Sequence, residues 1–70
     1  MHVYEMRAEY EGDATGGTIH QWHMTANGEL VGLCGHAVNP DSAKMSDDAW
    51  GHTREKFCHV CGALWLRQVP

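Results

Sequence analysis

The 70-residue chain has few of the large aliphatic side chains from which a protein of this size builds its core. It contains one Ile and four Leu, while eight glycines and six histidines dilute an apolar fraction of 43%. A chain this short is near the lower limit at which a hydrophobic core alone stabilises a fold. We therefore expect one domain, residues 1–70, that is held together by disulfides, by a metal ion or by a partner chain.

The sequence also lacks a fourth cysteine. Disulfide frameworks of this size usually contain an even number of cysteines, and this chain has three, at positions 34, 58 and 61. No apolar run follows a basic N-terminal stretch as in a secretory signal peptide, and no run is long enough for a membrane span. These features predict a reducing, cytoplasmic compartment without membrane attachment, in which closely spaced cysteines bind metal or perform redox chemistry more often than they form structural bridges.

Basic residues are scarce and scattered. The five Lys and Arg stand at positions 7, 44, 54, 56 and 67, and the formal net charge is −4. Nucleic-acid-binding proteins normally present a basic face, because neutralising phosphates supplies much of their affinity. The composition argues against a nucleic-acid partner, and we expect another protein instead.

The local patterns predict a small β-rich domain. Residues 1–17 are predicted to form an edge strand and a loop. The clearest unit is a β-hairpin over about 18–34, in which two apolar stretches flank Asn27-Gly28, the strongest short hairpin signal. A short helix is predicted near 46–50, with Ser46 as its cap. The apolar residues 63–67 fit a strand or a short helix, and we favour the strand.

Cys58 and Cys61 carry the most specific chemical signal. Two intervening residues allow both sulfurs to reach one ion at about 2.3 Å, as in a zinc knuckle. Gly62 follows directly, which suits a tight turn with positive φ that leaves backbone N–H groups free to bond the sulfurs. The spacing predicts one half of a structural zinc site.

The other half must come from elsewhere in the chain. With a three-residue hairpin loop, His20 faces Cys34 across the ladder, at a Cβ separation of about 4.5–5.5 Å that suits two ligands of one ion. This register predicts one Zn²⁺ held by His20, Cys34, Cys58 and Cys61. His36, two residues beyond Cys34, is the runner-up for the fourth ligand. The alternation of the strand places His23 on the face opposite His20.

Several short motifs together resemble a known group of proteins. These motifs are His20-x-Trp22, Leu33-Cys34-Gly35, Trp50-Gly51 and Cys58-His59-x-Cys61-Gly62-Ala63-Leu64. The chain resembles, over residues 18–67, the small stand-alone zinc-finger-like proteins of actinobacteria, including streptomycetes. The resemblance implies a zinc-ribbon-like fold with His20, Cys34, Cys58 and Cys61 as ligands, and it supplies no activity.

A four-ligand zinc site has no open position, so it cannot activate water or polarise a substrate. We therefore expect no enzyme, but a structural-zinc module that acts as a protein-interaction adaptor or a small accessory or regulatory subunit. Two alternatives stay open, a nucleic-acid-binding zinc ribbon and a thiol-redox or zinc sensor.

Overall fold

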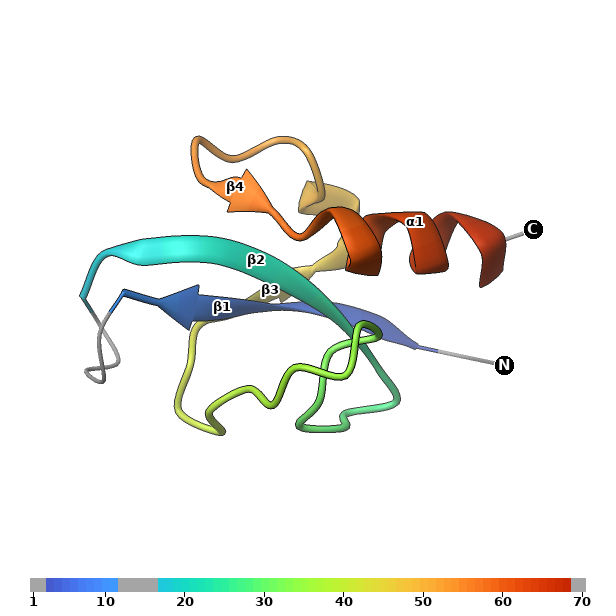
Figure 1. Cartoon of the computed structure of the whole chain (residues 1–70), viewed down its shortest axis with the longest axis horizontal. Helices are drawn as coiled ribbons and strands as arrows, with labels where there is room; N and C mark the ends of the chain where they lie inside the picture. Colours follow the sequence, from blue (N-terminus) through green and yellow to red (C-terminus); the bar gives the residue numbers. More distant parts are fainter. Residues whose placement is uncertain (1–2, 12–16, 69–70) are drawn as a thin grey trace.

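A four-stranded sheet in the order β3-β1-β2-β4 is the framework of the computed structural model, which describes residues 3–11 and 17–68 (Figure 1). In chain order, the secondary-structure elements are β1 (Tyr4–Tyr10), β2 (Ile19–Ala26), β3 (Lys44–Ser46), the 3₁₀ helix η1 (Asp47–Ala49), β4 (Lys56–Phe57) and α1 (His59–Gln68). The predicted loop in residues 11–17 falls mostly on 12–16, outside the described residues. The predicted β-rich domain is confirmed at this level, whereas its zinc-ribbon-like character stays a prediction.

β1 is an inner strand, not the edge strand that its sequence predicted. It pairs antiparallel with β2, with Met6 opposite Met24 and Ala8 opposite Trp22, and antiparallel with β3 on its other side. These four residues are buried and belong to the core cluster, against which Trp65 of α1 packs. The reason for the error is that seven residues of loose alternation do not reveal how many neighbours a strand will have.

The predicted hairpin over 18–34 is wrong in its second half. The Asn27-Gly28 turn forms, with φ of 57° and 73°. However, β1 and β4 occupy the two sides of β2. The following segment therefore runs as a loop that returns to β2, where the Leu33 N–H donates to the Met24 carbonyl at 2.8 Å.

The C-terminal apolar segment is the helix α1, so the favoured strand is wrong. Gly62 lies within this helix and lacks the positive φ that its place after Cys61 suggested. A Cβ atom at Gly62 would lie 3.3 Å from Trp50, so the glycine lets the indole pack closely on the helix. The short helix predicted near 46–50 is confirmed as η1, with the Asp48 N–H bonded to Ser46 Oγ.

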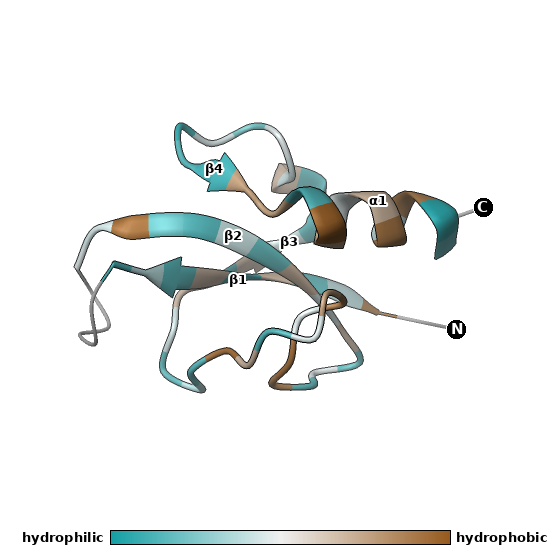
Figure 2. Ribbon diagram, in the orientation of Figure 1, coloured by the Kyte–Doolittle hydropathy of each residue, from teal (hydrophilic) through white to brown (hydrophobic). Residues whose placement is uncertain are grey.

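The core is small and contains two of the three cysteines. Its buried cluster consists of Met6, Ala8, Trp22, Met24, Cys58 and Cys61. α1 carries apolar residues along its first turns and polar ones at its C-terminal end (Figure 2). In the described part of the chain, no helix has both the length and the apolar composition needed to cross a membrane. The sequence has few aliphatic residues, and methionines and cysteines accordingly make up most of this core cluster.

Candidate metal centre

His23, Cys34, Cys58 and Cys61 come together in one cluster. Each offers one donor atom, and the four donors lie within 4.8 Å of one another. The histidine belongs to β2, Cys34 to the loop after the Asn27-Gly28 turn, and the other two cysteines to the start of α1. A site of this kind joins three segments that are distant in sequence.

The contacts around His23 Nδ1 match the dimensions of a tetrahedral metal site. Nδ1 lies 3.4 Å from Cys34 Sγ and 3.5 Å from Cys61 Sγ. In a tetrahedral zinc site, bonds of about 2.1 Å to nitrogen and 2.3 Å to sulfur place these two atoms about 3.6 Å apart. Three thiols and one imidazole form a donor set that suits zinc. The cluster could therefore bind one metal ion with little movement of the side chains.

The backbone of β2 positions the donors on both sides of His23. The Cys58 N–H donates to the Trp22 carbonyl at 2.9 Å, which ends the pairing of β4 with β2 just before α1 begins. The carbonyl of Met24 accepts the N–H of Leu33, which holds Cys34 beside the strand. The peptide groups that flank His23 thus fix the segments that carry the sulfurs.

Gly32 leaves room for the donors. A Cβ atom at this position would lie 3.3 Å from Cys61 Sγ and 3.4 Å from His23 Nδ1. A turn closed by the hydrogen bond from Gly35 N–H to the Gly32 carbonyl then brings Cys34 back toward the strand. A side chain at position 32 would crowd two of the four donors, which would have to give way by a few tenths of an ångström.

Glu9 orients the imidazole of His23. Its carboxylate Oε1 lies 2.5 Å from His23 Nε2 and accepts a hydrogen bond from Gln21 Nε2 at 3.0 Å. With the proton on Nε2, the lone pair of Nδ1 faces the sulfurs, which is the usual arrangement of a metal-bound histidine and its supporting carboxylate. Burial tends to raise the pKa of Glu9, but the hydrogen bonds from His23 and Gln21 outweigh it and hold this pKa below its ordinary value.

Cys61 is completely buried, and this burial raises the pKa of its thiol to about 12. Without a cation nearby, the thiol therefore keeps its proton at neutral pH. A metal ion supplies the positive charge that stabilises the thiolate, so metal binding at this site must release protons.

The structure does not bring His20 into the cluster. Its side chain is 48% exposed, and its Nδ1 lies 3.9 Å from the carboxylate of Glu11. The register that paired His20 with Cys34 required the hairpin that does not form. Instead, the bond between Leu33 and Met24 places Cys34 beside His23, a histidine that the predicted ligand set did not include.

His36 lies next to the cluster. Its ring stacks on that of His23, with centroids 4.7 Å apart and an interplanar angle of 9°, and its Nε2 lies 3.6 Å from Glu9 Oε1. His23, His36 and Glu9 thus form a second close group. A metal ion lies in the plane of each imidazole that binds it, and two stacked rings have separate planes, so His23 and His36 cannot bind the same ion in this arrangement. We therefore take Glu9 and His36 as groups that support His23 in the cysteine site.

No local signal in the sequence singles out His23. It stands between two buried residues of β2, and its carboxylate partner Glu9 is 14 positions away. Comparisons with known proteins found no match to a protein-family model, a curated protein or a solved structure. The resemblance of residues 18–67 to actinobacterial zinc-finger-like proteins therefore stays a prediction.

Proposed function

We propose that the chain is a non-enzymatic structural-zinc module that works as a protein-interaction adaptor in the reducing cytoplasm. The main support for a zinc site is that four donor atoms, from three separate segments, lie within 4.8 Å of one another. All four are protein side chains, so a tetrahedral ion held by them has no open position for water or substrate. The ion's role is then to hold the fold together.

Such an ion would compensate for the small core. It would link the loop at Cys34, the strand at His23 and the start of α1. Among the described residues, backbone hydrogen bonds join these segments from Leu33 to Met24 and from Cys58 to Trp22. In small domains of this kind, the free energy of metal binding is coupled to the free energy of folding. We therefore expect the metal-free chain to lose the packing of α1 on β2.

Metal analysis of the purified chain tests this part of the proposal. We expect one zinc per chain, and we expect a chelator to remove the ion together with the cooperative thermal transition. Added zinc should restore both. A chain that is folded with no bound metal, and that does not change on adding zinc, would contradict the structural-zinc role.

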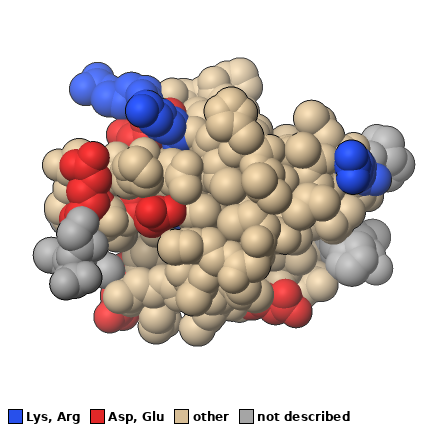
Figure 3. Space-filling model, in the orientation of Figure 1, with Lys and Arg blue, Asp and Glu red and all other residues tan. Residues whose placement is uncertain are grey.

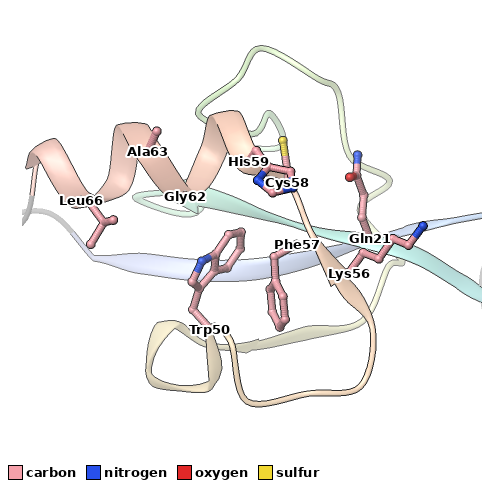
Figure 4. Close-up of a pocket in the computed structure, with 9 residues that line it drawn as sticks. All are labelled: Gln21, Trp50, Lys56, Phe57, Cys58, His59, Gly62, Ala63 and Leu66. Atoms are coloured by element: carbon pink, nitrogen blue, oxygen red, sulfur yellow. The ribbon is translucent and has the colours of Figure 1, made fainter.

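A groove beside α1 offers the surface for a protein partner. It has a volume of about 570 Å³ and lies between β4, η1 and the helix (Figure 4). Trp50 and Phe57 stand side by side in it, with ring centroids 4.8 Å apart, and Leu66, which is 71% exposed, lies along the helix. The full lining is Gln21, Trp50, Lys56, Phe57, Cys58, His59, Gly62, Ala63 and Leu66.

The charge of the groove indicates the partner's chemistry. Although the chain has nine Asp and Glu, none of the described residues that line the groove is acidic, and Lys56 lies at one end of it. We take the partner to be a protein segment that places an apolar side chain against Trp50 and Phe57 and a carboxylate near Lys56. The nucleic-acid alternative has no comparable support, since Lys and Arg form separate groups on the face shown in Figure 3.

Matched variants test the groove. A partner captured in stoichiometric amount by the wild-type chain should be lost with Lys56→Glu and with Leu66→Glu, because both changes oppose its charge or its apolar contact. Glu29→Lys, which changes an exposed loop residue outside the groove lining, should leave capture intact. Capture that is equal in all four proteins would exclude this surface.

A further inference from the structure

The three cysteines of the cluster differ in their access to solvent. Cys34 is half-buried, whereas Cys58 is 9% exposed and Cys61 is fully buried. The oxidation of a cysteine depends on its thiolate character and on its exposure. In a site where a metal ion holds all three sulfurs as thiolates, exposure decides which of them a small oxidant in solution meets first.

Cys34 also has a second sulfur beside it. Cys61 Sγ lies within 4.8 Å of Cys34 Sγ, and both sulfurs approach the same nitrogen, His23 Nδ1, at 3.5 and 3.4 Å. An oxidised Cys34 therefore has a partner for disulfide formation without any large rearrangement. This partner lies on α1, so the new bond would join the loop to the helix.

We propose that Cys34 is a peroxide-reactive cysteine that forms a disulfide with Cys61 and so releases the metal. The inference rests on the zinc site proposed above. The Cys34 thiolate attacks one oxygen of hydrogen peroxide, an S–O bond forms, the O–O bond breaks and hydroxide leaves. The Cys61 thiolate then attacks the Cys34 sulfur, an S–S bond forms, the S–O bond breaks and a second hydroxide leaves.

The reaction takes two electrons from the two thiolates and reduces one peroxide. It leaves His23 and Cys58 as the remaining donors, too few for a closed site, so the ion dissociates. The disulfide keeps the loop and α1 together, while β2 loses its link to both through His23. A thiol reductant restores the two thiols and allows the metal to bind again.

The experiment uses the full chain loaded with zinc, whose metal content is measured first. Hydrogen peroxide is added in increments while a chromogenic chelator reports free zinc. We expect zinc release to parallel the loss of two of the three thiols, and mass spectrometry without reduction to identify a Cys34–Cys61 bridge. Dithiothreitol with added zinc should reverse the change. Zinc that is retained as thiols are lost, or a first disulfide between Cys58 and Cys61, would overturn the proposal.

Cys34→His provides the decisive variant, because histidine keeps a metal donor at the exposed position but cannot form the disulfide. We expect its peroxide-driven zinc release to be slower by about tenfold or more, since only buried sulfurs remain. His20→Ala, an exposed histidine outside the cluster, should match the wild type. Equal rates in the wild type and Cys34→His would overturn the role of Cys34, whereas a wild-type chain without bound metal at the start would refute the zinc site itself.

Discussion

The two halves of the metal centre are specified in different ways. Cys58 and Cys61 are three positions apart, and their spacing at the start of a helix brings them together locally. His23 and Cys34 meet only because β1 and β4 occupy the sides of β2 and the following loop bonds back to Met24. The local half, Cys58 and Cys61, can be recognised from a short motif. The assembled half, His23 and Cys34, depends on strand pairing over the whole sheet. Each half can be perturbed separately.

Removing a sulfur from the local half should have the largest effect. Cys61→Ser deletes a fully buried donor that contacts His23 and lies within 4.8 Å of the Cys34 sulfur, and we expect the chain to lose stoichiometric zinc and its cooperative unfolding transition. Structural zinc in small domains contributes apparent binding free energies of about 10–16 kcal/mol, more than such a domain retains without it. Metal analysis and circular dichroism measure both effects. A folded, zinc-containing Cys61→Ser chain would mean that the local half is dispensable.

The pH dependence of zinc affinity tests whether both halves supply thiolates. Burial raises the pKa of Cys61 to about 12, so this thiol is protonated in the metal-free chain at neutral pH. Each thiol that loses its proton on binding should strengthen zinc binding by about tenfold for each unit of rising pH. Competition with a chromophoric chelator between pH 6.5 and 8, roughly around the ordinary titration range of thiols, measures the slope. An affinity independent of pH would contradict coordination by the cysteines.

The assembled half is tested by its histidine. His23→Ala removes the nitrogen donor, and we expect zinc affinity to fall by more than about a hundredfold, beyond the range seen for residues that only support a ligand. His20→Ala should have no such effect, since that side chain is exposed and lies near Glu11. The reverse result in a chelator competition would restore the hairpin register that the sequence suggested.

Two glycines allow a matched comparison of space around the site. A Cβ atom at Gly32 would approach Cys61 Sγ and His23 Nδ1, whereas one at Gly62 would approach the ring of Trp50. We expect Gly32→Ala to weaken zinc binding, and Gly62→Ala to change thermal stability with little change in zinc affinity. Equal zinc affinities in the two variants would show that the donors can move aside without cost.

The smallest effect is expected for the residue that supports His23. Glu9→Gln keeps the size of the side chain but removes the negative charge of the group that accepts the hydrogen bond from His23 Nε2. It should lower zinc affinity by about tenfold. Glu11→Gln, beside His20, is the matched control. Because the pKa of Glu9 is lowered in the folded chain, its contribution is present above about pH 4.5 and disappears as the pH falls through that lowered pKa. Wild-type affinity in Glu9→Gln at pH 7 would exclude the orienting role.

The sequence by itself determined the features that depend on neighbouring residues. A few adjacent side chains and their backbone preferences determine three of them. These are the Asn27-Gly28 turn, the capped short helix after Ser46, and the closeness of the Cys58 and Cys61 sulfurs. The shortage of aliphatic residues also indicated that the fold needs support beyond its core. Cys34 was also predicted as a ligand, although the hairpin register that placed it opposite His20 does not form.

The tertiary structure decided which histidine joins the cysteines. His20 and His23 have the same chemistry and lie three residues apart on one strand, so only the pairing of that strand distinguishes them. A change of strand partner alters the register, and the register selects which side chain meets Cys34. The second outcome, the helix over residues 59–68, brings Gly62 against Trp50, which belongs to a separate segment of the chain. Both outcomes depend on contacts between distant segments, which no short stretch of sequence contains.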